Sequence, residues 1–126
     1  MNDANPLAVK KTVYKVLTLV EWEEASQIGQ IETALDQQDG FIHLSSATQL
    51  NMTLALYFSR EEKVVLLQIK ESDIIEGLTY EHSQKRGGQF AHFYGKLSTK
   101  KILQYWHLDR SAFSLPCEVI LQAEQD

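Results

Sequence analysis

The chain has 126 residues and is 44% hydrophobic, enough to bury the core of one domain but not of two. Its 17 acidic residues outnumber its 12 basic ones, and the net charge of -5 argues against a general nucleic-acid binder, which usually presents a basic surface. The single cysteine excludes an intramolecular disulfide, and no apolar run reaches the length of a signal-peptide core or a membrane span. These features predict a cytoplasmic protein that does not associate with membranes.

The residue pattern predicts an α+β domain over residues 12–126, after a loose leader at residues 1–11. About six strands in two small sheets are expected, with two main helices that both lie in the first half of the chain. Short β-branched, aromatic or wholly apolar runs between turn signals give the expected strands: Thr12–Thr18, 41–44, Lys63–Lys70, 78–82, 90–94 and 101–108. The run Lys63–Lys70 is almost wholly apolar between charged ends, which is typical of a central strand.

The two main helices are expected from a capping signal and from periodicity. Thr18 and Glu21 match a capping box, which predicts a helix over residues 19–27 that ends before Gly29. Apolar residues recur at helical spacing over residues 47–58, and that apolar face is expected to be core. The pattern does not decide the structure of three stretches. Residues 30–39 are ambiguous and could form one helical turn, and residues 71–76 could form a turn or a short helix. Residues 117–121 form a last apolar stretch.

Two histidines lie inside expected strands, whose side chains alternate between the two faces of a sheet. His43 shares one strand face with Phe41 and Ser45, and His92 shares one face of its own strand with Tyr94. The opposite face of each strand is apolar and suited to the core. Each strand therefore gathers polar groups beside an aromatic ring, which indicates a ligand cleft; ordinary packed histidines are the alternative.

A candidate anion-binding loop comprises Arg86, Gly87 and Gly88. The guanidinium fork matches phosphate or carboxylate, and two glycines let backbone amides approach an anion closely. The alternative is a flexible hairpin loop with a solvated arginine. Glu81 could act as a base or hold a ribose hydroxyl. It could equally be an exposed residue of an edge strand without a role in binding.

Metal and nucleophile chemistry have weaker signals. The possible metal ligands are His43, Glu81, His82 and His92, and none of them form a pair at a known ligand spacing. The serines that follow His43 lack the glycine-flanked turn of a nucleophilic serine. No metal cofactor is therefore expected.

The order of the stretches YKVL, EW, GFIHLS, VVLL, YE, RGG and FAHFYG resembles the domain of unknown function 952 family over roughly residues 13–116. The chain departs from the usual family pattern with Tyr80 where Trp is common and Ala91 where Pro is common. The resemblance implies a compact ADP-ribosyltransferase-like fold, a superfamily that binds NAD in a cleft between two small sheets. It further implies ribose or phosphate contacts from His43 and Ser45 and a phosphate contact from Arg86.

Three functions remain open from the sequence. The first is an enzyme that transfers ADP-ribose or a 2'-phosphate, the second a non-catalytic module that binds a nucleotide or small anion, and the third a structural or partner-binding domain with packed histidines. NAD is the possible cofactor, and a small-molecule nucleotide or anion is the expected partner. The candidate catalytic residues are His43, His92 and Glu81, and the candidate ligand-binding residues are Ser45, Arg86, Gly87, Gly88 and Tyr94.

Overall fold

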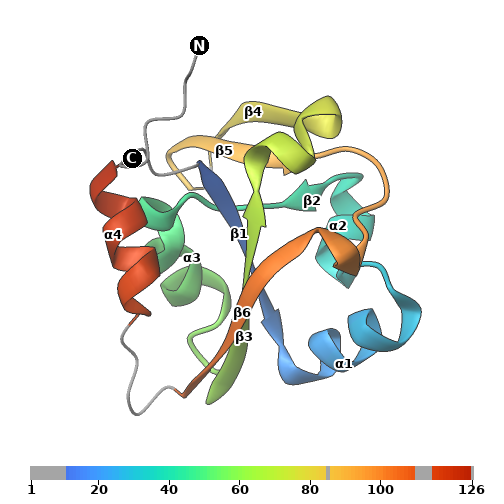
Figure 1. Cartoon of the computed structure of the whole chain (residues 1–126), viewed down its shortest axis with the longest axis horizontal. Coiled ribbons are helices and arrows are strands. Elements are labelled where there is room, and N and C mark those ends of the chain that lie inside the picture. Colours follow the sequence, from blue (N-terminus) through green and yellow to red (C-terminus); the bar gives the residue numbers. More distant parts are fainter. Residues whose placement is uncertain (1–10, 85, 110–114, 126) are drawn as a thin grey trace.

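Two three-stranded antiparallel sheets form the framework of the computed structural model, which describes residues 11–84, 86–109 and 115–125 (Figure 1). The first sheet has the order β1-β3-β6 and the second the order β2-β5-β4. The strands are β1 Thr12–Thr18, β2 Ile42–His43, β3 Lys63–Lys70, β4 Leu78–Ser83, β5 Gly88–Phe93 and β6 Ile102–Asp109. The predicted α+β class with six strands in two small sheets is confirmed, while the predicted leader lies, except for Lys11, outside the described residues.

In the described part of the chain, four α-helices accompany the sheets: α1 Leu19–Ile28, α2 Ala34–Asp39, α3 Leu50–Tyr57 and α4 Cys117–Gln125. The ambiguous stretch before residue 40 holds α2. Helix α4 corrects the expectation that the main helices lie in the first half of the chain. The apolar run 117–121 was too short to show a period, but Val119 and Ala123, four residues apart, both pack into a core. None of these helices is long and apolar enough to cross a membrane.

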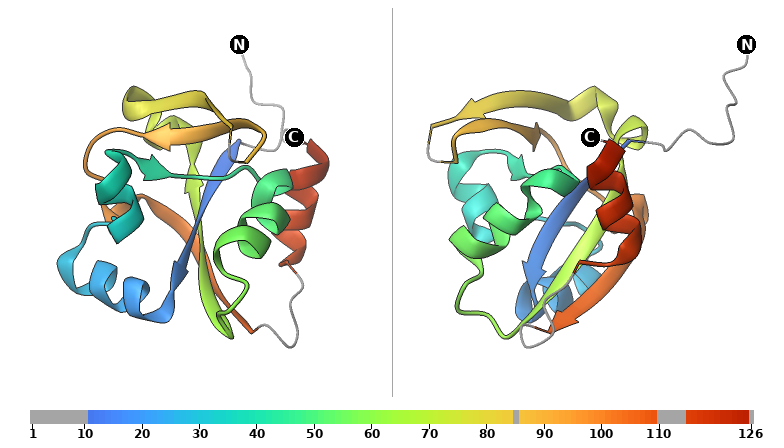
Figure 2. Two further views of the ribbon diagram at one scale, coloured as in Figure 1. Left: turned by 180° about the vertical axis from the view of Figure 1, so that it is seen from behind. Right: turned by 90° about the vertical axis from the view of Figure 1, so that its left-hand side faces the viewer.

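The first sheet separates two hydrophobic cores because its side chains alternate between its faces. On β3, Val65 and Leu67 face a core shared with the second sheet, whereas Val64 and Leu66 face a core shared with α3 and α4. The left view of Figure 2 shows helices α3 and α4 on one side of β1 and β3, helices α1 and α2 on the other, and the second sheet across the top. Strand β3 is buried on both faces and central, as its apolar run predicts.

A backbone bridge ties the two sheets together at the free edge of β1. The N–H of Tyr14 donates to the carbonyl of Ser45 at 2.8 Å, and the N–H of Ser45 donates back to the carbonyl of Tyr14 at 2.9 Å. Within the described residues, no strand pairs with the remainder of β1 up to Thr18 on this side. This edge is where the site described below forms.

The capping box at the start of α1 is present as predicted, and it supports a testable expectation. Thr18 Oγ1 accepts from the N–H of Glu21 at 3.1 Å, and Glu21 Oε1 accepts from the N–H of Thr18 at 2.9 Å. Replacing Thr18 by Ala is expected to lower the free energy of unfolding by about 1 kcal/mol, because the N–H of Glu21 loses its acceptor. Urea denaturation measures this, with Thr18→Ser as the matched control that keeps the hydroxyl. Equal losses in both variants would contradict a capping role.

Candidate functional site

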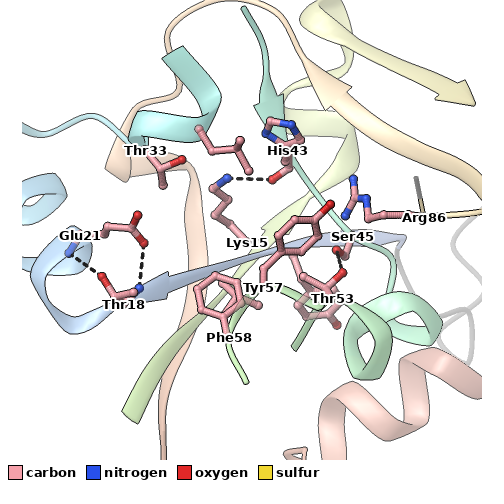
Figure 3. A pocket seen from close by; sticks show the side chains of 13 residues that line it. Lys15, Thr18, Glu21, Thr33, His43, Ser45, Thr53, Tyr57, Phe58 and Arg86 are labelled. Atoms are coloured by element: carbon pink, nitrogen blue, oxygen red, sulfur yellow. Dashed lines mark hydrogen bonds between the residues drawn. The ribbon is translucent and has the colours of Figure 1, made fainter. Parts of the chain in front are cut away.

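Two adjoining cavities of about 220 and 230 Å³ lie beside β1 and β2. The first extends along β1 to Thr18 and Glu21, and the second extends to Phe41 and His92. Figure 3 shows the first cavity, with side chains from β1, α1, β2, α3 and the β4–β5 connection around it. We call the two cavities together the cleft. Four residues line both: Leu35, His43, Tyr57 and Arg86.

A buried ion pair between Lys15 and Asp36 lies at the base of the first cavity. Lys15 comes from β1 and is 6% exposed, and its Nζ lies 2.9 Å from each carboxylate oxygen of Asp36. The same Nζ donates to the backbone carbonyl of His43 at 3.0 Å. Burial lowers the pKa of Lys15, although the Asp36 carboxylate opposes that shift. A charge this deeply buried requires its partner, so the pair fixes β1 against α2 and β2.

Asp36 is the hub of this network, because its carboxylate has no exposed surface and five contacts. Besides Lys15, it accepts from the backbone N–H of Thr33 at 3.0 Å and of His43 at 3.1 Å. Its Oδ1 also lies 2.7 Å from Nδ1 of the His43 ring. Burial alone would raise the pKa of Asp36, but the hydrogen bonds and the charge of Lys15 hold it well below its usual range. The carboxylate therefore stays ionised and orients the His43 ring.

The His43 ring is held between two carboxylates. Its Nδ1 contacts Asp36, and its Nε2 lies 2.8 Å from Oδ2 of Asp39. When both ring nitrogens carry a proton, the ring donates to both carboxylates; with one proton, only one of the contacts is a hydrogen bond. The ring is 17% exposed and lines both cavities.

A second imidazole–carboxylate pair lies beside the first, because β2 and β5 pair His43 with His92. Nδ1 of His92 lies 2.7 Å from Oε1 of Glu81, and that oxygen also accepts from the hydroxyl of Tyr94 at 2.7 Å. The phenol and imidazole contacts lower the pKa of Glu81, and the carboxylate raises that of Tyr94. Burial lowers the pKa of His92, against the influence of Glu81. The His92 ring stacks on Phe41 at 3.9 Å and lies 5.8 Å from the His43 ring.

Arg86 enters the cleft from the β4–β5 connection and is 6% exposed. Its guanidinium lies 3.6 Å over the ring of Phe90 and 5.8 Å from the ring of Tyr57. No residue in the described ranges forms an ion pair or a side-chain hydrogen bond with it, in contrast to Lys15. Burial lowers the pKa of Arg86. Its guanidinium nitrogens open onto the solvent of the cleft, because no side-chain nitrogen or oxygen among the described residues is both buried and without a hydrogen-bond partner. An anion that enters the cleft would therefore find donors that are not already used by the protein.

The structure brings six of the eight sequence-predicted site residues into one neighbourhood. Four of them line the cleft: His43, Ser45, Arg86 and His92. Glu81 and Tyr94 line neither cavity; Glu81 contacts His92, and Tyr94 donates to Glu81. Ser45 Oγ is bonded to Thr53 Oγ1 at 2.8 Å.

The other two predicted residues, Gly87 and Gly88, lie at the β4–β5 turn and line neither of the two cavities. Gly87 has a φ of 69°, which favours glycine, and its N–H donates to the carbonyl of Ser83 at 2.8 Å. Its amide is thus used by the turn. Among the described residues, no group of three or more His, Cys, Asp or Glu side chains is arranged to hold a metal ion.

Sequence reasoning missed four residues of the site: Lys15, Asp36, Asp39 and Tyr57. Two of them had a usable signal. A lysine in the middle of an otherwise apolar strand indicates a buried partner, and Thr33 with Asp36 matches a capping box. Asp39 and Tyr57 stood out only as a turn residue and a core position.

Comparison with known proteins gives the family. Residues 16–105 match the family model described as Protein of unknown function (DUF952). The chain belongs to this family. The match confirms the resemblance stated from GFIHLS and RGG.

Solved structures of the protein CC0527 from Caulobacter crescentus are similar to this DUF952 chain. Its crystal structure is 35% identical, with a TM-score of 0.72, and the match covers 78% of this chain and 86% of that one. Its solution NMR structure is 33% identical, with a TM-score of 0.65, over 80% of this chain and 89% of that one. No curated protein matches this chain.

Proposed function

We propose that the cleft binds a phosphorylated small molecule, with a nucleotide of the NAD class as the first candidate. The observation that carries this proposal is Arg86, a residue that is 6% exposed and whose guanidinium has no counter-ion among the described residues, on the wall shared by both cavities. Its planar fork matches two phosphate oxygens. The net charge of -5 describes the whole surface and does not oppose a local cationic site.

The shape of the cleft supports an elongated ligand. Each cavity, at about 220 and 230 Å³, is below the roughly 300–1,000 Å³ of typical small-molecule sites, so a nucleotide would extend through both. Tyr57 and Phe41 offer aromatic surface to a base or nicotinamide ring. The ADP-ribosyltransferase-like fold that the family resemblance implies, a fold whose members bind NAD between two small sheets, would favour the same ligand class.

A thermal-shift titration tests the binding proposal. NAD, ADP-ribose and a 2'-phosphorylated nucleotide are the test ligands, and adenosine is the matched control without phosphate. A ligand at a hundred times its dissociation constant stabilises the fold by roughly 2.7 kcal/mol, which shifts the melting temperature by several degrees. The proposal expects such a shift with at least one phosphorylated ligand and little with adenosine. No shift with any of them would contradict it.

The second candidate function is catalysis on the bound ligand, as a transferase of ADP-ribosyl or 2'-phosphate groups. The observation that favours it is the geometry of His92. Glu81 engages Nδ1, and Nε2 has no hydrogen-bond partner among the described residues. Burial keeps the ring neutral to a lower pH than usual, so Nε2 is suited to accept a proton from a hydroxyl or a water molecule. His43 and Glu81 would then orient the ligand and His92, respectively.

If the protein turns over a ligand, His92→Gln is expected to lower kcat roughly 10²- to 10⁴-fold, because the general base is lost. The ligand-induced thermal shift should remain. In the wild type, kcat/KM should fall on the acid side with a midpoint below about 6.5, since burial lowers the pKa of His92. His107→Gln, an exposed histidine on β6, is the control. Undiminished turnover in His92→Gln would contradict this role, and binding without turnover would identify a binding module.

A further inference from the structure

The two carboxylates that hold His43 are not equivalent. Asp36 is fully buried and is also bonded to Lys15 and Thr33, so it cannot leave the ring without exposing a buried charge. The Asp39 side chain is 35% exposed, and its only hydrogen bond or ion pair within the described residues is the one to Nε2 of His43. A turn of the Asp39 side chain would break that one contact and return the carboxylate to water.

The exposed carboxylate is also the one at the cleft. Asp39 lines the second cavity together with His43 and Arg86, whereas Asp36 lines neither cavity. The contact between Asp39 and Nε2 thus lies at the wall where a ligand would bind. Arg86, on the same wall, has no carboxylate partner among the described residues.

The position of Asp39 in its helix gives it no stabilising role there. It is the last residue of α2, directly before Gly40, which ends the helix with a φ of 82°. A carboxylate at a helix C-terminus opposes the helix dipole, so α2 gains nothing from the charge. Among the described residues, the contact with His43 is the one side-chain interaction that the carboxylate makes at this place.

We propose that Asp39 occupies the place of the ligand's anionic group, and that an oxygen of the phosphate displaces it from Nε2 of His43. This inference rests on the proposed function. The displaced carboxylate turns into solvent, and the phosphate is held from two sides, by the imidazole N–H and by the guanidinium of Arg86. Two donor groups on one wall select an anion with several oxygens, such as a diphosphate or a phosphate monoester, over a neutral ligand. In the free protein, Asp39 acts as an internal competitor that weakens binding.

Titration calorimetry with inorganic pyrophosphate tests the inference. Asp39→Asn is expected to bind roughly fivefold or more tightly than the wild type, because the variant removes both a competitor and a like charge. The matched control is Asp73→Asn, which removes an exposed acid that lies outside both lining sets, and its affinity should stay near that of the wild type. A third variant, His43→Gln with Asp39→Asn, should lose the gain when compared with His43→Gln alone.

The outcomes separate this inference from the proposed function. Equal or weaker binding in Asp39→Asn, or an equal gain in Asp73→Asn, would overturn the competitor role while the anion site stands. A gain that persists in the His43→Gln background would assign the effect to general charge and would also overturn it. No binding of pyrophosphate to any variant would overturn both proposals. A gain that is confined to Asp39→Asn and depends on His43 is the expected result.

Discussion

Replacing Asp36 by Asn is expected to lower the free energy of unfolding by about 3–5 kcal/mol, the usual loss when one partner of a buried ion pair is removed. The amide cannot neutralise Lys15, whose side chain is 6% exposed and which has no other acid at ion-pair distance among the described residues, Glu21 acting on it only from farther away. It also cannot serve Thr33 and His43 with two acceptor oxygens. Urea denaturation followed by circular dichroism measures the change.

A double-mutant cycle identifies the source of that loss. Lys15→Met removes the cation at similar volume, and the double variant Lys15→Met with Asp36→Asn leaves no buried charge unpaired at this position. Its loss should be smaller than the sum of the single losses, by a coupling of about 1–3 kcal/mol. Asp73→Asn is the surface control and should change stability by less than about 0.5 kcal/mol. Strict additivity would contradict the buried pair as the stabilising unit.

The pH dependence of stability should follow the same residues. The folded state lowers the pKa of Asp36, so its contribution is present above the unfolded value of about 3.9 and is lost as pH falls through the lower folded value. The folded state also lowers the pKa of His92, so stability should begin to fall as pH drops below about 6.5. Below about pH 3.9, the free energy of unfolding should therefore decrease less with falling pH in Asp36→Asn than in the wild type.

Replacing Arg86 by Gln is expected to weaken binding of ADP-ribose by about 1.5–3 kcal/mol, or roughly 10- to 150-fold in the dissociation constant. The reason is that charge-assisted hydrogen bonds to phosphate are lost at the wall common to both cavities. Arg86→Lys keeps the charge without the planar fork, so its affinity for ADP-ribose should lie between that of the wild type and that of Arg86→Gln. Titration calorimetry gives these constants.

Two controls make this result specific. Arg60→Gln removes an exposed arginine that lies outside both lining sets and should leave the affinity unchanged. The unfolding free energy of Arg86→Gln should fall by no more than about 2 kcal/mol, the worth of the cation–π contact with Phe90, because no described residue loses an ion pair or a side-chain hydrogen bond. An unchanged affinity for ADP-ribose in Arg86→Gln would contradict the role of Arg86.

Features with a local cause could be predicted from the sequence. The bounds of β1 and β3 follow from runs of β-branched and apolar residues, and the α1 start follows from the reciprocal bonds of Thr18 and Glu21. Alternation of side chains placed His43 and His92 on polar faces opposite the core, where the structure has them. The strand at Phe41 is shorter than expected: β2 comprises only Ile42 and His43, and Phe41 precedes it with its ring stacked on His92.

Features that depend on tertiary contacts could not be predicted. The pair of Lys15 and Asp36 spans 21 residues of sequence, and nothing local distinguishes Asp36 from a surface cap. The role of Glu81 depends on the register of β4 against β5, which pairs it with Phe90 and brings its carboxylate to His92. That register follows from the whole sheet rather than from the residues around Glu81.

The most direct test of the central claim is to map backbone amide chemical shifts in a titration with ADP-ribose. The cleft proposal predicts the largest and saturable changes at His43, Tyr57 and Arg86 and in the residues next to them. Adenosine should cause smaller changes around Arg86, because it carries no phosphate. Changes confined to the exposed side of β6 around Leu103 and Tyr105, or no saturable change at millimolar ligand, would contradict a phosphate-binding cleft.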